Sequence, residues 1–130
     1  MSNFFDSNTL VYLIQFESEK QVRANELIEV GGIISVQVLN EFVNVARRKL
    51  KLPWDGILGT LSMVRDCLEV VPLTLDIHDR ALTIARTEKF RIYDCNIIAA
   101  AELSGCDVLY TEDLSHGQRI GSVTICNPFK

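Results

Sequence analysis

Five short runs of apolar residues, separated by stretches of helical pattern or turn residues, most constrain the fold of this chain. They are Phe4-Phe5, residues 33–36, Val70-Val71, residues 108–110 and residues 123–126. Continuous apolar strands that alternate with helices are typical of a parallel sheet covered on both faces. The sequence therefore predicts an α/β protein, a three-layer α/β/α fold with a short parallel sheet of about five strands. Right-handed connections would bring the carboxyl ends of these strands to one edge of the sheet.

The length and composition favour a single compact domain over residues 1–130. A chain of 130 residues fits the commonest domain size, and 48% hydrophobic with 23% charged residues is typical of a globule. No apolar run approaches the roughly 20 residues of a membrane span. Asp6 interrupts the first apolar stretch, which is not typical of a signal peptide. We expect a cytoplasmic protein that is not bound to a membrane.

The four cysteines show no metal-binding or redox spacing. No C-x-x-C pair and no matching pair of histidines occurs, so neither a zinc site nor a redox motif is indicated. Each cysteine has apolar neighbours, and free cysteine packs as a small hydrophobic residue. We expect reduced cysteines in the core at Cys67, Cys95, Cys106 and Cys126.

Two of the expected helices carry an acid close to an apolar face. At 100° per residue, residues 38–50 form a broad apolar arc with Glu41 at its edge. Residues 94–104 are apolar on nearly every side, and Asp94 stands in the first turn, where the helix dipole favours an anion. Further helices are expected over residues 10–16, 17–30 and 76–88, and over a stretch that ends near Cys67.

These two acids and two others can converge at one edge of the sheet. Asp6 follows the first expected strand and Asp113 follows the fourth, while the helices of Glu41 and Asp94 leave the same edge. Two carboxylates about 4 Å apart repel by about 4 kcal/mol at an effective dielectric near 20, and burial adds a desolvation cost. A divalent cation removes both penalties. The four acids therefore predict a site for one or two Mg²⁺ or Mn²⁺ ions.

Two of the four acids also have a simpler explanation at a helix start. Asp6, followed by Ser7 and Asn8, can be the N-cap of the helix that comes next. Asp94 can be an N-cap or a first-turn acid that interacts with the helix dipole. Either role stabilises a helix without a metal, so neither acid alone indicates a metal site.

The other two acids have simpler explanations as well. Glu41 can be a solvated acid or can pair with Arg48 on the helix surface. Asp113 can simply bind loop amides, or neighbouring Glu112 can be the functional acid. Four unrelated surface acids and caps need not all map to one sheet edge, so their conjunction favours the metal site.

The net charge of −4 argues at first against a nucleic-acid partner, because phosphate binding usually leaves a basic footprint. Setting the four acids aside leaves 13 acidic residues, which equals the 13 lysines and arginines. The basic run 47–49 with Lys51 can grip an RNA backbone, as can Lys89 and Arg91. Cations at a helix C-terminus also stabilise the helix dipole, so the run 47–49 can equally be structural.

Four segments in this order resemble the four motifs of the PIN domain. They are FFDSN at residues 4–8, SVQVLNEF at 35–42, IYDCNIIAAA at 92–101 and YTED at 110–113. The resemblance spans essentially the whole chain, and its size is similar to that of the VapC-type toxins of toxin–antitoxin pairs. Cys95-Asn96 depart from the family, which more often has alanine and then a variable residue. The segment LSHGQRI resembles one branch of the family, in which His116 either approaches substrate or bonds within its loop.

The resemblance implies a metal-dependent endoribonuclease. Asp6 would be the central ligand of Mg²⁺ or Mn²⁺, Asp94 and Asp113 would complete the metal site, and Glu41 would hold a metal-bound water or act as base. Ser7 and Asn8, polar groups in the first turn of the helix that follows, would orient Asp6. RNA would be the substrate, a small antitoxin protein the partner, and a homodimer the expected assembly.

Two alternatives remain at this point. A non-catalytic PIN-like module would keep the fold and use it to bind RNA or protein. A receiver or phosphohydrolase-type domain would also gather acids around Mg²⁺. The second alternative fits less well, because Val70-Val71 runs into Pro72 without an aspartate and position 8 is an asparagine instead of the second acid of Asp-x-Asp.

Overall fold

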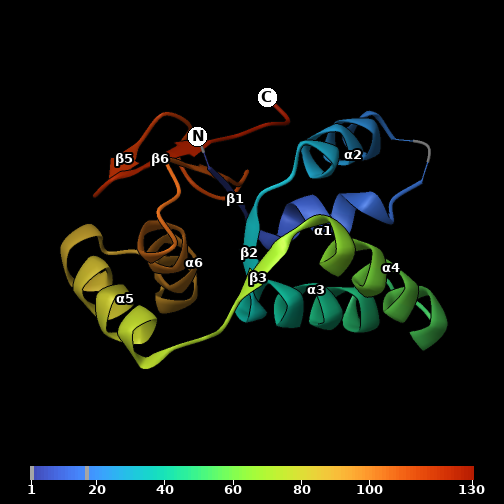
Figure 1. Ribbon diagram of the computed structural model, residues 1–130, viewed down its shortest axis with the longest axis horizontal. Helices are drawn as coiled ribbons and strands as arrows, with labels where there is room; N and C mark the ends of the chain where they lie inside the picture. Colours follow the sequence, from blue (N-terminus) through green and yellow to red (C-terminus); the bar gives the residue numbers. More distant parts are fainter. Residues whose placement is uncertain (1, 17) are drawn as a thin grey trace.

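The computed structural model describes residues 2–16 and 18–130, in which the centre is a six-stranded sheet (Figure 1). The strands are β1 (Asn3–Phe5), β2 (Ile33–Ser35), β3 (Glu69–Val71), β4 (Val108–Tyr110), β5 (Arg119–Ile120) and β6 (Val123–Cys126). Five of them are parallel, and β5 pairs antiparallel with β6. The expected mainly parallel sheet is confirmed, with one short antiparallel strand added at its edge.

Six helices in the described ranges connect and cover these strands. They are α1 (Ser7–Leu13), α2 (Glu19–Val30), α3 (Val36–Arg48), α4 (Trp54–Cys67), α5 (Leu75–Glu88) and α6 (Ile92–Leu103). Figure 1 shows α5 and α6 on one side of β2 and β3, with α1, α3 and α4 on the other side. The expected three-layer arrangement is therefore present.

In the strand order β3-β2-β1-β4-β6-β5, the chain adds strands first to one side of β1 and then to the other, which makes a topological switch point between β1 and β4. From β1 the chain proceeds outward through β2 to β3, and it then crosses back through α5 and α6 to β4 on the other side of β1. In open α/β sheets, ligands bind outside the carboxyl ends of the strands at such a switch point. A ligand site is expected where β1 and β4 end.

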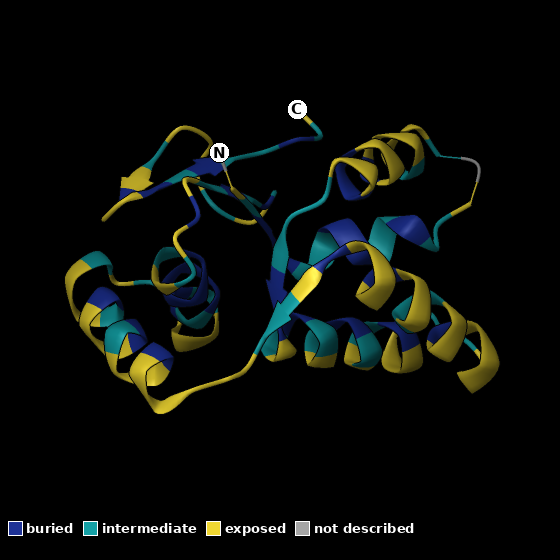
Figure 2. Cartoon of the chain, in the orientation of Figure 1, coloured by how far each residue is buried: buried dark blue, intermediate teal, exposed yellow. Residues whose placement is uncertain are grey.

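Local sequence fixes the two helices that border this switch point. The hydroxyl of Ser35 accepts a hydrogen bond from Val38 N at 3.4 Å, which caps α3 directly after β2. The apolar stretch 97–101 of α6 is buried throughout, as the dark blue α6 in Figure 2 shows. Since α3 is capped at the sheet edge and α6 is held in the core, residues in their early turns have fixed positions near the ends of the strands.

The boundaries differ from the expectations in a few places. The first helix begins at Ser7 instead of residue 10, and Val36 is the first residue of α3 instead of the last of a strand. The expected helix start at Glu17 lies outside the described residues. Cys95 and Cys106 are buried, but the expectation of a core position is wrong for Cys67, which is exposed at the end of α4. Within the described ranges, no helix is long and apolar enough to cross a bilayer.

Candidate metal centre

A cavity of about 450 Å³ lies at the switch point, and the four acids of interest all line it. Asp6 follows β1 and Asp113 lies beyond β4. Glu41 is in the second turn of α3, and Asp94 is in the first turn of α6. The remaining lining residues are Ser7, Gln37, Asn40, Asn44, Arg91 and Tyr93. Four segments that are far apart in the chain thus bring one carboxylate each to the same cavity.

Asp6 is the most buried of these acids, with an exposed fraction of 5%. It is the N-cap of α1, since its Oδ1 accepts a hydrogen bond from Ser7 N at 2.7 Å. Its Oδ2 accepts a second hydrogen bond from Thr111 Oγ1 at 2.9 Å. The capping role and the cavity-lining role are therefore compatible, because each carboxylate oxygen accepts only one of these bonds.

Thr111 connects the two halves of the site, a role that the sequence interpretation missed. Its buried hydroxyl donates to Asp6 and accepts from Asn8 Nδ2 at 3.2 Å and from Asp113 N at 3.1 Å. A hydroxyl has one proton and two lone pairs, so these three bonds use its full capacity. The available signal was a small polar residue directly after an apolar strand, one step before the two candidate acids.

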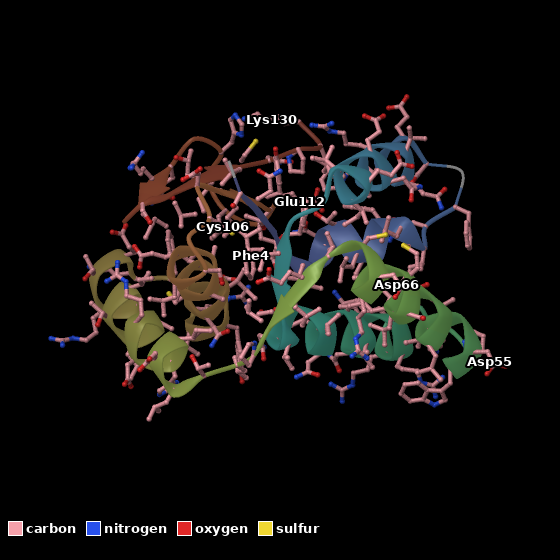
Figure 3. All side chains as sticks on the ribbon, in the orientation of Figure 1. Phe4, Asp55, Asp66, Cys106, Glu112 and Lys130 are labelled. Carbon is pink, nitrogen blue, oxygen red and sulfur yellow. The ribbon has the colours of Figure 1, made fainter. Side chains whose placement is uncertain are left out.

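The structure distinguishes between the two neighbouring acids that follow β4. Asp113 lines the cavity, and its Oδ2 accepts a hydrogen bond from Asn8 Nδ2 at 3.3 Å. Glu112 instead binds the Tyr12 hydroxyl and forms an ion pair with Lys20 at 3.2 Å. Figure 3 labels Glu112 near α2, the helix that contains Lys20. Asn8, which was expected to orient Asp6, reaches Asp6 only through Thr111 and contacts Asp113 directly.

Glu41 is half-buried and faces other acids. Its pKa is raised from 4.5 to about 7, first by burial and then by repulsion from Asp6, Asp94 and Asp113. Within the part of the chain that the structure describes, no ion pair joins Glu41 to Arg48 or to another cation. A carboxylate in this setting is stabilised by an added cation or by a proton.

Asp94 has the only cation of the cavity as a neighbour, among the described residues. Arg91 Nε lies 3.7 Å from Asp94 Oδ2, but the Arg91 side chain is 87% exposed. The pKa of Asp94 is still raised, because burial outweighs the attraction of Arg91 and Asp113 adds repulsion. An exposed pair of this kind contributes little stability, so Arg91 does not neutralise the cavity.

The donor set of the cavity fits a hard divalent cation. Burial raises the pKa of Asp6 to about 6 against the hydrogen bonds from Ser7 and Thr111, and Asp113 and Asp94 raise it further. In the described ranges, no group of three or more Asp, Glu, His or Cys side chains is close enough together to hold a metal ion by itself. Mg²⁺ usually keeps several waters and takes one or two carboxylates together with substrate phosphates. An open cavity lined by four carboxylates matches this preference.

Without metal, the free energy of unfolding is expected to fall as pH rises from about 5 to about 7. Folded Asp6 has a pKa of about 6 against an ordinary 3.8, so the folded state holds a proton that the unfolded state has lost. Deprotonation of Asp6 in this range therefore destabilises the fold by about 1 kcal/mol, and the rest of the cost of its raised pKa falls between about pH 4 and 5. Glu41, with its pKa raised to about 7, acts in the same direction. Urea unfolding with a chelator at several pH values measures this.

One other acid, Glu102, affects the stability in the opposite direction, and the addition of Mn²⁺ serves as the control. Arg80 lowers the pKa of Glu102 below 4.5, and the stability gained from that pair is complete before this range begins. Saturating Mn²⁺ should flatten the profile, because a bound cation stabilises the ionised acids. A free energy of unfolding that rises from about pH 5 to 7 in chelator would contradict the expected charge repulsion in the cavity.

His116 and Arg47, which were also singled out in the sequence, bond to groups other than the four acids. His116 Nδ1 accepts a hydrogen bond from Asn127 N at 2.9 Å, which is a bond within the loop region. Arg47 Nη1 donates to Leu52 O at 2.8 Å, and its guanidinium lies 4.7 Å from the ring centre of Trp54. Arg47 therefore secures the end of α3, as the structural alternative for the basic run predicted.

Known structures are similar to this chain over nearly its full length. A toxin–antitoxin complex from Klebsiella pneumoniae has a chain with 20% identity and a TM-score of 0.76, and the match covers 99% of each chain. VapBC-1 from nontypeable Haemophilus influenzae matches at 17% identity and a TM-score of 0.74, over 100% of both chains. VapC20 of Mycobacterium tuberculosis, a Sarcin-Ricin loop cleaving toxin, matches at 17% identity and a TM-score of 0.70, over 86% of this chain and 90% of that one.

At these identities the neighbours establish the fold. Comparison with curated protein sequences finds no match. The family model of the PIN domain matches residues 4–118, a span that includes all four acids and Thr111. The sequence resemblance is thereby confirmed, and the receiver or phosphohydrolase alternative is set aside. This chain belongs to the PIN domain family.

Proposed function

We propose that this protein is a divalent-metal-dependent endoribonuclease that hydrolyses RNA phosphodiester bonds. The observation that carries the proposal is the cavity at the switch point, where carboxylates from four separate segments meet with Arg91 as their only cationic neighbour among the described residues. The raised pKa values of Asp6 and Glu41 support it, since both acids are stabilised by an added cation. Perturbed acids in a cleft are typical of catalytic sites.

In this proposal each acid has a role that follows from its surroundings: three acids bind metal and Glu41 acts as the base. Asp6, fixed by Ser7 and Thr111, and the neighbouring Asp94 and Asp113 hold one or two Mg²⁺ or Mn²⁺ ions. Such an ion, when bound, would offset the charge that develops on the phosphate and lower the pKa of water. Glu41 carries no hydrogen bond or ion pair within the described ranges and has a pKa of about 7. Because no other group in the described ranges occupies its carboxylate, Glu41 can accept the proton of the attacking water.

The printed descriptions of the structural neighbours support the substrate class and suggest a partner. One neighbour is described as a Sarcin-Ricin loop cleaving toxin, and others are toxin–antitoxin or VapBC complexes, two of them bound to DNA. By analogy, the proposed substrate of this chain is RNA, its proposed partner is a small antitoxin protein, and its proposed assembly is a homodimer.

The proposal is tested by assaying purified protein on unstructured and hairpin RNA with Mg²⁺, Mn²⁺, Ca²⁺ or chelator. We expect cleavage with Mg²⁺ or Mn²⁺ and none with chelator, and isothermal calorimetry should show a divalent ion bound at the acids. Glu41→Gln should bind metal with little change but cleave poorly. Absence of metal binding at millimolar Mn²⁺, together with absence of cleavage, would overturn the proposal and favour the non-catalytic binding module.

A further inference from the structure

A stripe of amide side chains on α3 faces the same cavity as the acids. At 100° per residue, Gln37, Asn40, Glu41 and Asn44 fall within an arc of about 100°, and all four line the cavity. The stripe spans two helical turns. It places three neutral amides beside the one acid of this helix.

The amides have no structural task that explains this placement. Within residues 2–16 and 18–130, the side chains of Gln37, Asn40 and Asn44 form no hydrogen bond to the protein. Asn40 and Asn44 are exposed and Gln37 is partly buried, so their donors and acceptors are open to a ligand in the cavity. A neutral amide does not compete with the acids for a cation, and it presents both a donor and an acceptor. This chemistry suits the edge of a nucleobase.

Tyr93 supplies a flat surface in the same cavity. It lies in the first turn of α6, directly before Asp94, and 68% of its surface is exposed. Among the described residues it has no ring or cation partner. An exposed aromatic ring beside a phosphate-processing site is typical of a platform on which an unpaired base stacks.

We propose that Tyr93 and the amides of α3 bind the base of one unpaired nucleotide next to the cleaved phosphate and determine base preference there. The inference rests on the proposed RNA cleavage and specifies its substrate. Tyr93 stacks on the face of the base, while Asn44, Asn40 and Gln37 bond to its edge. An amide pairs at two points with N6 and N7 of adenine, so adenine is the expected base.

A second cavity beside the acids has a different lining, so base preference is expected on only one side of the cleaved bond. This second cavity of about 420 Å³ shares Arg91, Asp94 and Asp113 with the first and adds Lys89, Phe90, Leu114 and Ser115. It offers cations and a hydroxyl, which suit a phosphate and sugar, and it contains no amide side chain. The acids therefore lie between a base-reading cavity and a backbone-holding cavity, and base preference is expected on only one side of the cut.

The first test is the distribution of cleavage sites in a randomised unpaired RNA, read by sequencing the cut ends. Wild type should favour adenine at one position adjacent to the cut. Asn44→Ala and Gln37→Ala should flatten this preference, whereas Asn25→Ala, an exposed amide on α2 outside the cavity, should keep it. Tyr93→Ala should raise the KM for RNA about tenfold with a smaller change in kcat. Tyr93→Phe should keep the wild-type KM, because the face of the ring remains.

A second measurement separates this inference from the proposed function. In the Asp6→Asn background, where cleavage is removed, fluorescence anisotropy compares binding of short RNAs that differ only in one central base. We expect the adenine-centred RNA to bind several-fold more tightly, and adding Asn44→Ala should abolish the difference. Wild-type protein that cleaves without base preference, or Asn44 and Gln37 variants that keep it, would overturn the inference. Wild-type protein that never cleaves RNA counts against the proposed function instead.

Discussion

Replacing Asp6 with asparagine is expected to reduce kcat/KM for RNA by at least about 10³-fold while making the metal-free protein more stable. The loss follows because Asp6 lies deepest among the acids and, in the proposed mechanism, would contribute several kcal/mol by holding the metal ion. The stability gain follows because the pKa of Asp6 is raised to about 6, so its charge is unfavourable in the fold at pH 7.5. After allowing for a weakened hydrogen bond, the expected gain is about 1–2 kcal/mol.

Thermal unfolding with and without Mn²⁺ measures both aspects of the Asp6 prediction. In chelator, Asp6→Asn should melt a few degrees above wild type, and the addition of Mn²⁺ should raise the melting temperature of wild type more than that of the variant. Glu112→Gln is the matched control, because Glu112 follows the same strand as Asp113 but binds Tyr12 and Lys20 outside the cavity. Glu112→Gln should retain cleavage. An Asp6→Asn variant that cleaves at the wild-type rate would end the assignment of Asp6.

Thr111→Val is expected to be the most damaging change that leaves every acid in place. Valine has nearly the shape of threonine but cannot donate to Asp6 or accept from Asn8 and Asp113 N. Unfolding free energy should fall by about 1–3 kcal/mol, since buried polar groups lose their partner. Mutation of a group that orients a metal ligand typically lowers metal affinity or activity by about 10–100-fold. We therefore expect kcat/KM and Mn²⁺ affinity each to fall by about that factor.

The control for this change is Thr111→Ser, which retains the hydroxyl and removes only the methyl group. We expect Thr111→Ser to keep most of the metal affinity, with a small loss of stability from the missing methyl group. The measurements are urea unfolding and calorimetric titration with Mn²⁺. If Thr111→Val bound Mn²⁺ as tightly as wild type, the hydroxyl would be structural and would not position Asp6 and Asp113.

The sequence predicted the elements of this fold well where a periodic pattern was long or an apolar run was continuous. The runs near residues 4, 33, 70, 108 and 123 are all strands of the parallel sheet. The short antiparallel strand β5 was missed, because Arg119–Ile120 is too short to form a recognisable pattern and is held by its pairing with β6. Cys67 was assigned to the core from its apolar neighbours, but it lies on the outer face of α4.

The four acids of the candidate site could be predicted from the sequence, but the hydrogen bonds that connect them could not. Each acid follows a strand or lies in the first two turns of a helix that starts at the sheet edge, positions that sequence pattern can place at one sheet edge. The bonds that Thr111 makes join residues 6, 8, 111 and 113, and sequence pattern contains no information on which side chain fills the gap between two strands. The same is true of Glu112, whose partners lie on α1 and α2.

By itself, the sequence determined the alternation of strands and helices, and therefore the parallel sheet with four acids at its carboxyl edge. Local propensity and hydrophobic periodicity are properties of short segments, so they can be read without coordinates. The tertiary structure alone decided that β4 lies beside β1, that Asp113 instead of Glu112 faces the cavity, and that Thr111 joins the acids. These depend on strand order and side-chain direction, which contacts between distant segments set when the core packs.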